Sequence, residues 1–385
     1  MIRFGTGGWR AIIADEFTKE NIRLVTAGLC ALMEAEGQVG ATICLGYDRR
    51  FLSKEAMFWA AEVLAGYGFC PYVINRSVPT PLIMFTVKQM GLPYGLAITA
   101  SHNPAIYNGI KIFTFGGRDA DLTVTGKIEA EIEKLRPQDV KSIPYGDALA
   151  AGKIREGYPF NEYIDSILQM IDTGAIRRSR LRIAIDPMYG VSCNCLRTLL
   201  LTCRCDVDMI HDQHDTLFGG RMPAPSEETL RMLATYVVDN RCNLGIATDG
   251  DADRLGVIDE HGNYLHANTL LVEMLAVTGK TVAQLYREIT EKYGMLCYED
   301  AAFTMTPERK RELQSLVFEK LRTPDFGDGV VRINREDGCK IYFADGSWVI
   351  CRFSGTEPLL RMAAEAATRQ QARDYIRRWR ELLEL

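Results

Sequence analysis

Residues Tyr94–Pro104 read YGLAITASHNP, and the interpretation of the chain starts from them. The first five residues are apolar or glycine, which predicts the end of a buried strand. Pro104 and the residues after it predict a loop. Ser101 therefore lies on a tight turn just past a strand, with His102 beside it and Lys111 further along the chain. Ser101 in such a turn is either a nucleophile or phosphate carrier, or an ordinary residue of an Asn-Pro turn. The other motifs of the chain decide between these two interpretations.

Strands and helices alternate around this stretch. We expect strands at 41–47, 70–75 and 94–98, and helices at 21–37, 54–68 and 82–91. This alternation predicts βαβ units and a mainly parallel sheet. Ligands bind beyond the carboxyl ends of the strands in such sheets, and Asp48 and Ser101 both fall there.

A second unit of the same kind follows the polar segment 137–158, which we interpret as a domain boundary. Its expected strands are 181–186, 205–210 and 244–248, and its expected helices are 191–201 and 228–240. Residues 268–278 and 281–293 predict two helices with no accompanying strand. The remainder predicts a small α+β domain, with an extended segment at 295–305, helices at 307–321 and 369–383, and strands at 330–343, 348–353 and 360–365.

Composition excludes several classes of protein. The 385 residues are enough for two to four domains. The net charge of -5 argues against a nucleic-acid surface, and the chain has no apolar run long enough for a membrane span. The N-terminus lacks the pattern of a secretion signal, so we expect a cytoplasmic protein.

The 11 cysteines are odd in number and scattered. Cys193/Cys195 and Cys203/Cys205 form two C-x-C pairs, a spacing shorter than zinc sites use. We expect reduced, mostly buried thiols.

An acidic loop follows the expected strand 244–248. Asp249, Asp251 and Asp253 alternate there, and Arg254 comes directly after them. Three alternating carboxylates converge readily on one hard cation. The pattern partly resembles a calcium-binding EF-hand loop, but Arg254 stands where that loop needs glycine and the flanks predict strands. Mg²⁺ shared with a phosphate oxygen is therefore the favoured ligand, against the alternative of a solvated acidic turn.

Three further segments carry cations. Residues 352–361 read RFSGTEPLLR, so two arginines bracket a Ser-Gly-Thr turn that suits a phosphate; the alternative is a hairpin with surface arginines. Residues 5–10 read GTGGWR, a donor-rich loop from which Arg10 could reach an anion. Lys111 alternates with apolar residues on an expected strand and is either a proton shuttle or an exposed lysine. Together with Ser101 and the acidic loop, these parts are what phosphoryl transfer requires.

The four motifs resemble, in order, those of the α-D-phosphohexomutase family, which includes phosphoglucomutase, phosphomannomutase and phosphoglucosamine mutase. The resemblance implies a phosphoserine at Ser101 that donates its phosphoryl group to a hexose phosphate through a hexose 1,6-bisphosphate, which serves as intermediate and activator. It implies Mg²⁺ on Asp249, Asp251, Asp253 and the Ser101 phosphate. It places Arg10, His102 and Lys111 in the active site, with Lys111 as general acid or base. It assigns the substrate's other phosphate to Arg352, Ser354, Gly355, Thr356 and Arg361.

The resemblance also implies the domain plan and partners. We expect a phosphoserine-bearing α/β domain (1–140), a metal-binding α/β domain (155–260), a helical remnant of the third, sugar-recognition domain (261–294) and a C-terminal α+β phosphate-binding domain (295–385). The two α/β domains would be related, with mixed, mainly parallel sheets. The partners would be hexose phosphates, with no nucleic acid and no membrane, and the protein would be a monomer or homodimer.

One departure concerns the third domain. The family's sugar-specificity loop has a Gly-Glu-x-Ser-Gly pattern, which is absent between Asp253 and Arg352. On the order of 100 residues, the size of a domain, are missing, with the junction near 270–272. We therefore expect impaired mutase turnover, with a catalytically inactive sugar-phosphate- and Mg²⁺-binding remnant as the alternative. A hydrolase of another fold is disfavoured because no Gly-x-Ser-x-Gly elbow occurs.

Overall fold

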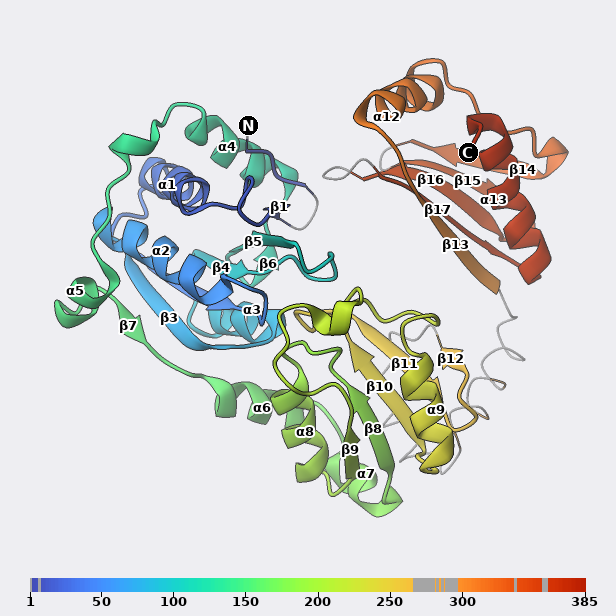
Figure 1. Cartoon of the computed structure of the whole chain (residues 1–385), viewed down its shortest axis with the longest axis horizontal. Coiled ribbons are helices and arrows are strands. Elements are labelled where there is room, and N and C mark those ends of the chain that lie inside the picture. The colour runs from blue at the N-terminus through green and yellow to red at the C-terminus, as the bar shows by residue number, and fades with distance from the viewer. Residues whose placement is uncertain are drawn as a thin grey trace. The chain divides into compact units, whose positions relative to one another are not determined.

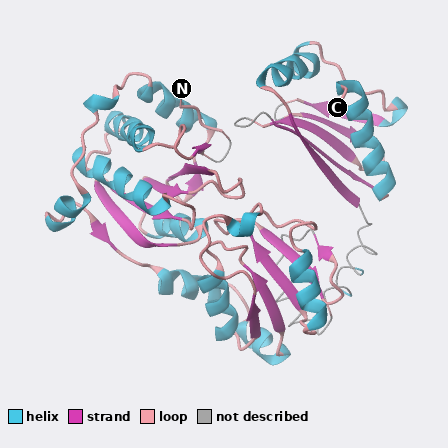
Figure 2. Ribbon diagram, in the orientation of Figure 1, coloured by secondary structure: helices cyan, strands magenta, loops and turns pink. Residues whose placement is uncertain are grey.

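A computed structural model describes residues 2–5, 8–265, 281, 284, 287, 297–335, 338–354 and 359–385. These residues fall into two units, Met1–Leu285 and Tyr286–Leu385, each described by itself. Figures 1 and 2 show three sheets with helices packed on them. None of the helices in the described part of the chain is long and apolar enough to cross a membrane.

The first sheet of the first unit is mixed and lies between two helical layers. Its order is β1-β5-β4-β2-β3-β7, with β6 beside β5. β2 pairs in parallel with both β3 and β4, whereas β5 runs antiparallel to β1 and β4. The strands are β1 (Trp9–Ile12), β2 (Thr42–Tyr47), β3 (Cys70–Ser77), β4 (Tyr94–Ile98), β5 (Tyr107–Thr114), β6 (Arg118–Asp119) and β7 (Arg155–Glu156).

Successive side chains of β2 alternate between the two faces of this sheet and contribute to the core on each face. Ile43 and Leu45 join the core beneath α1, α2 and α4, while Cys44 joins the separate core beneath α3. The helices of this part are α1 (Lys19–Ala35), α2 (Ser53–Gly66), α3 (Thr80–Gln89), α4 (Leu122–Ile132), a 3₁₀ turn η1 (Pro137–Asp139) and α5 (Tyr145–Ala150). Because successive side chains of a strand point to opposite faces, both faces of a fully buried strand must be apolar.

The second sheet has the order β12-β11-β10-β8-β9, with β10, β8 and β9 parallel and β11 and β12 antiparallel. Its strands are β8 (Arg182–Asp186), β9 (Asp206–Met209), β10 (Leu244–Thr248), β11 (Leu255–Asp259) and β12 (Tyr264–Leu265). The accompanying helices are α6 (Phe160–Leu168), α7 (Thr173–Ser179), α8 (Cys193–Thr202), a 3₁₀ turn η2 (Phe218–Gly220) and α9 (Arg231–Asp239).

The segment 137–158, expected as a boundary, carries structure of its own. It holds η1, α5 and β7, and β7 pairs in parallel with β3 at Tyr72 and Val73. The chain thus completes the first sheet after residue 150 and then enters α6. The sequence pattern could not predict the strand β7, because this strand has only two residues, Arg155 and Glu156, and both are exposed.

The second unit is a five-stranded antiparallel sheet, ordered β13-β17-β16-β15-β14, with helices packed against it. Its elements are β13 (Cys297–Thr304), α12 (Pro307–Gln314), a π turn η3 (Ser315–Glu319), a 3₁₀ turn η4 (Gly327–Gly329), β14 (Val330–Asn334), β15 (Cys339–Phe343), β16 (Trp348–Phe353), β17 (Leu359–Ala366) and α13 (Arg369–Leu383). It has its own core, centred on the fully buried Trp379.

Two expectations for this unit need correction. The single strand at 330–343 is wrong: β14 and β15 are two strands that pair antiparallel. Gly338, which precedes β15, has φ +96°, a conformation that glycine adopts without strain. The expected helix 307–321 is α-helical only to Gln314 and continues as the π turn. The helices expected at 268–278 and 281–293 and the junction near 270–272 lie outside the residues that the structure describes, apart from residues 281, 284 and 287.

Candidate active site

Ser101 lies in a tight turn at the carboxyl end of β4. Its side chain points at the acidic loop: Oγ donates to Asp249 Oδ2 at 2.8 Å and lies 3.4 Å from His102 Nδ1. Ser101 is 1% exposed, and its φ of +51° is in the left-handed region that non-glycine residues rarely adopt. A serine in a rare backbone conformation, buried against a carboxylate, is an unusual place for an ordinary turn residue.

The acidic loop joins β10 to β11. Asp249, Asp251 and Asp253 each offer one carboxylate oxygen, and these oxygens all lie within 4.8 Å of one another. The loop is tight because Ala252 takes φ +61° and because Asp249 Oδ1 accepts the backbone N–H groups of Asp253 and Arg254, each at 3.1 Å. The backbone conformation and these hydrogen bonds to backbone N–H groups thus set the spacing of the carboxylates.

Lys111 crosses from the first sheet to this loop. It comes from β5 and its Nζ donates to Asp251 Oδ2 at 2.7 Å and to Asp253 Oδ2 at 2.6 Å. Lys111 is 4% exposed, so the alternative of an exposed strand lysine is wrong. Burial alone would lower the pKa of Lys111, but the two carboxylates outweigh burial and raise it. The ammonium is therefore charged at neutral pH.

The pKa values of Asp249 and Asp251 depend on the neighbouring carboxylates and on Lys111. Burial, with Asp251 and Asp253 nearby, raises the pKa of Asp249 well above its ordinary value. Burial pushes the pKa of Asp251 in the same direction, but the Lys111 ammonium outweighs it and holds that pKa below the usual range. Three carboxylates thus lie close together around one lysine, and a further cation beside them would favour the ionised form of Asp249.

The acidic loop fits a divalent cation. Asp251 Oδ1 is buried and has no hydrogen-bond partner among the described residues, and a buried oxygen without a partner is costly. Mg²⁺ takes oxygen ligands and keeps several positions for water or phosphate. Asp249, Asp251 and Asp253 would hold it, and Ser101 Oγ lies beside them.

Arg10, from β1, and Arg254 also lie near this site. Arg10 Nη1 donates to Asn103 Oδ1 at 2.7 Å, on the Ser101 turn. Arg254 Nε lies 4.0 Å from Asp249 Oδ2, and its side chain is 48% exposed. Ser101, His102, Lys111, Arg10 and the acidic loop, which the sequence scatters over more than 200 residues, thus meet in one place.

The second unit holds the remaining predicted residues. Arg352 of β16 and Arg361 of β17 are directly opposite partners in the register of these two strands. Ser354 N donates to Leu359 O at 2.8 Å. Lys310 of α12, which the motif search missed, donates to Ser354 O at 2.6 Å. Gly355 and Thr356 lie outside the described residues.

Sequence reasoning placed Asp48 at the ligand-binding end of the first sheet without giving it a role, and it missed Thr80 and Arg50, which also support the first site. Thr80, the first residue of α3, donates its hydroxyl to Asp251 Oδ2 at 2.8 Å and its backbone N–H to Asp251 O at 2.9 Å. Asp48 and Arg50 lie buried beneath the Ser101 turn. Pro79 and Pro81 flank Thr80, and this local pattern predicts a loop. It does not indicate the contact of Thr80 with Asp251.

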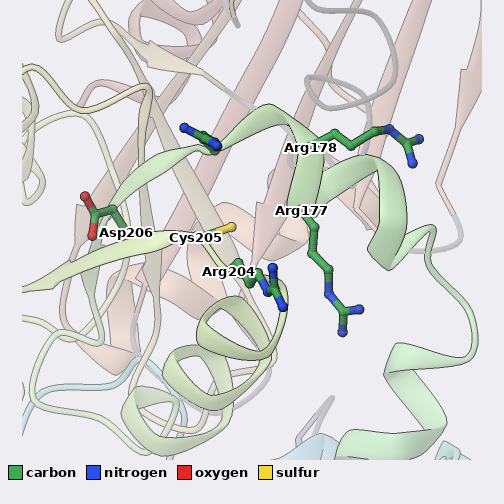
Figure 3. Close-up of a pocket in the computed structure, with 6 residues that line it drawn as sticks. Arg177, Arg178, Arg204, Cys205 and Asp206 are labelled. Atoms are coloured by element: carbon green, nitrogen blue, oxygen red, sulfur yellow. The ribbon is translucent and has the colours of Figure 1, made fainter.

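Two cavities lie in the second sheet's region. One, of about 490 Å³, opens beside the acidic loop and is lined in part by Thr248, Asp253 and Arg254. Another, of about 660 Å³, is lined by Arg177, Arg178, Arg180, Arg204, Cys205 and Asp206. Figure 3 shows Arg178 extending away from Arg177 and Arg204, so these side chains do not converge on one ligand.

Arginines at the second cavity have a structural role. Arg177 and Arg178 lie in the last turn of α7, and Arg177 Nε donates to Thr202 O, the last residue of α8, at 3.3 Å. Cations near helix C-termini offset the helix dipole.

Three family models match the chain in order. They are the phosphoglucomutase/phosphomannomutase alpha/beta/alpha domain I at residues 1–139, domain II at 161–262 and the C-terminal domain at 305–382. The chain belongs to the α-D-phosphohexomutase family. A match to the family's third domain is absent between the second and the last of these.

Relatives of this family align along nearly the whole chain. The chain is similar to a phosphoglucomutase/phosphomannomutase of Thermococcus kodakarensis, 26% identical over 456 residues, which covers 99% of this chain and 98% of the relative. It is also similar to a "probable phosphoglucosamine mutase" of Methanobrevibacter smithii, 27% identical over 449 residues and covering 96% of each. Both alignments are longer than 385 residues, so part of each relative faces a gap in this chain.

Solved structures share the fold. A structure from Thermus thermophilus, described as a putative phosphomannomutase, has a TM-score of 0.81 at 21% identity and covers 100% of this chain and 99% of its own. The Paramecium phosphoglucomutase known as parafusin has a TM-score of 0.77 at 14% identity and covers 100% and 96%. These likenesses confirm the predicted α/β class. The family models confirm the predicted family.

Proposed function

We propose that this chain is a phosphohexomutase-type phosphotransferase in which Ser101 carries the phosphoryl group. The observation that supports this most directly is the 2.8 Å hydrogen bond from Ser101 Oγ to Asp249 Oδ2, which sets a hydroxyl at the edge of a three-carboxylate loop. The relatives named as phosphoglucomutase/phosphomannomutase and probable phosphoglucosamine mutase support hexose and hexosamine phosphates as the substrate class.

The half-reaction at Ser101 needs a nucleophile, charge balance and a proton donor. When a hexose 1,6-bisphosphate phosphorylates the enzyme, the bond between Ser101 Oγ and phosphorus forms and the bond between phosphorus and the sugar oxygen breaks. The serine hydroxyl gives up its proton, for which its hydrogen-bond acceptor Asp249 Oδ2 is the candidate base, and the departing sugar oxygen gains one. A charged Lys111 close to the site is the candidate donor of that proton.

A bound Mg²⁺ would supply the charge neutralisation that phosphoryl transfer requires. Around it, this chain's own residues hold the reacting groups. Arg10 bonds Asn103 Oδ1 and His102 lies beside Ser101 Oγ, so both are close enough to the turn to bind phosphoryl oxygens. In the second unit, Arg352, Arg361 and Ser354 are the candidates for the phosphate that does not react, together with Gly355 and Thr356.

We further propose that sugar turnover is weaker than phosphoryl transfer to Ser101. The absent match to the third domain supports this, because the resemblance implies that the third domain recognises the sugar, and loss of an orienting contact costs rate. The cavity beside Asp253 and Arg254 leaves room for a ligand next to the loop.

Two measurements test this proposal. Intact mass of the purified chain, incubated with glucose 1,6-bisphosphate and Mg²⁺, should show one added phosphoryl group, and Ser101→Ala should show none. Conversion of glucose, mannose and glucosamine 1-phosphates to their 6-phosphates is then assayed. Phosphorylation without turnover supports the impaired enzyme. Turnover at rates typical of complete mutases would overturn the impairment, and a chain that stays unmodified would favour the inactive binding remnant.

A further inference from the structure

One buried guanidinium gathers the backbone carbonyls of the Ser101 turn. Arg50 follows β2, and its side chain has no exposed surface. Its Nη2 donates to Ser101 O and Asn103 O, each at 2.6 Å, and its Nη1 donates to Pro104 O at 2.9 Å and Tyr107 O at 3.0 Å. Because the guanidinium donors are fixed in one plane, Arg50 holds these four carbonyls in one mutual geometry.

Asp48 holds the same turn from its other side. Its Oδ1 accepts the Ser53 hydroxyl at 2.7 Å and the Arg50 backbone N–H at 2.9 Å. Its Oδ2 accepts the Thr99 hydroxyl at 2.7 Å and lies 3.4 Å from Arg50 Nε. Thr99 Oγ1 in turn accepts the Ser101 backbone N–H at 2.8 Å. The Asp48–Arg50 pair therefore reaches both the N–H and the C=O of Ser101.

The backbone of Ser101 needs such support. Its φ of +51° is one that L-residues with a side chain seldom take, and conformations of this kind persist only where the surroundings over-determine them. If Ser101 relaxed to an ordinary conformation, its Oγ would leave Asp249. The direction of the hydroxyl thus depends on the bonds to Ser101 N and Ser101 O.

The pair is sealed from water by the second sheet's region. The Arg50 guanidinium stacks on the ring of Phe218, which is 1% exposed, at 4.9 Å from its centre. Burying two charges is costly, and such a pair often adds less to stability than apolar residues would. Arg50 also bonds two carbonyls with each terminal nitrogen. A costly buried pair that bonds the turn of the candidate nucleophile suggests a positioning role rather than a purely stabilising one.

We propose that Asp48, Arg50 and Thr99 are positioning residues that hold the backbone of Ser101 so that its Oγ faces the acidic loop. This inference rests on the proposed function of Ser101. None of the three is required to touch the substrate, and their effect passes through the turn.

The test compares four variants. Thr99→Val removes the hydroxyl that links Asp48 to Ser101 N at almost constant volume, and Thr99→Ser keeps the hydroxyl. Arg50→Lys keeps the charge but loses the planar fork. Thr26→Val is the matched control, because Thr26 is equally buried and its hydroxyl donates within its own helix, α1, to Ile22 O.

Each variant is measured in three ways. The first is the rate of phosphoryl gain at Ser101 from glucose 1,6-bisphosphate, followed by intact mass. The second is Mg²⁺ affinity by calorimetry. The third is hydrogen exchange of a peptide that spans residues 97–107. We expect Thr99→Val to slow phosphoryl gain about 10- to 100-fold, the size of effect that misplacing a reacting group by about 1 Å has.

The other readouts separate positioning from folding. Mg²⁺ affinity should be unchanged in Thr99→Val, exchange at 97–107 should rise, Thr99→Ser should restore the rate, and Thr26→Val should behave as wild type. Arg50→Lys, if folded, should show the same pattern as Thr99→Val. Equal rates in wild type and Thr99→Val, or unchanged exchange at 97–107, would overturn the proposal.

Failure of the proposed function would look different. If wild type is never phosphorylated, the role of Ser101 as phosphate carrier fails. Hydrogen exchange of the peptide 97–107 in Thr99→Val and Arg50→Lys still decides whether Thr99 and Arg50 hold the turn. Faster exchange confirms that they hold the backbone of Ser101, and unchanged exchange overturns this.

Discussion

At the scale of single residues, charge balance decides what the acidic loop can do. Lys111 neutralises part of the charge of Asp251 and Asp253, yet Asp249 keeps a raised pKa and Asp251 Oδ1 keeps no partner among the described residues. A divalent cation would satisfy both, because it lowers the cost of keeping the carboxylates ionised and offers the missing partner.

Removing one carboxylate should abolish the response to Mg²⁺. In wild type, Mg²⁺ at 100 times its dissociation constant should add about 2.7 kcal/mol to the free energy of unfolding. Asp251→Asn should remove this gain, measured by urea unfolding with and without Mg²⁺. Asp139→Asn is the control, since Asp139 is exposed and pairs with Arg136 on the surface. An Asp251→Asn chain that Mg²⁺ still stabilises would contradict the metal site.

At the scale of elements, α13 shows how a sequence pattern becomes a packed helix. Thr368 caps it by accepting Gln371 N, and Ala372, Ile376, Trp379 and Leu383 recur at helical spacing and are all buried. The opposite face is charged and exposed. Burial of this stripe against the sheet, and not intrinsic helix propensity, supplies most of the helix's stability.

Truncation of the central side chain of α13 should be costly. Trp379→Ala should lower the free energy of unfolding of its unit by about 3 to 5 kcal/mol, because it leaves a cavity in the core. Trp379→Phe should cost less, since it keeps most of the volume and removes an indole N–H that has no partner among the described residues. Arg377→Ala, on the exposed face, should change stability by less than about 0.5 kcal/mol. Urea titrations measure all three, and equal costs for Trp379→Ala and Arg377→Ala would contradict the packing argument.

At the scale of the whole molecule, the chain has two units with separate cores. The acidic loop, Ser101 and Lys111 all belong to the first, whereas Arg352, Arg361 and Trp379 belong to the second. Because these cores are separate, we expect ligands and substitutions at one unit to act on that unit's own unfolding equilibrium.

Calorimetry should record two unfolding transitions. Mg²⁺ should raise the midpoint of the transition of the first unit alone, and Trp379→Ala should lower that of the second alone. These shifts assign each transition without cutting the chain. A single transition that moves with both changes would show that the two units unfold together.

How much of the structure can be predicted from the sequence depends on how far apart in the chain the residues that form each feature lie. The Ser101 turn, the acidic loop and most helices and strands are encoded within a few residues, by apolar periodicity and by turn residues, and can be predicted from such local patterns. The break between β14 and β15 has a local signal, because residues 335–338 read REDG, a polar run whose Asp-Gly pair favours a hairpin turn between two strands. The two-residue β7 carries no periodicity at all.

Local patterns were therefore enough to predict the α/β class, the resemblance of four motifs to a known family was enough to predict the family, and the residues that carry the candidate chemistry stay a prediction. The folded chain was needed to show what holds those residues in place: Lys111 on Asp251 and Asp253, Thr80 on Asp251, and Arg50 on the carbonyls of the Ser101 turn. These partners are 51 to 171 positions apart in the chain. No local pattern encodes such a contact, because it depends on which strand ends and loops of the two sheets the fold brings together.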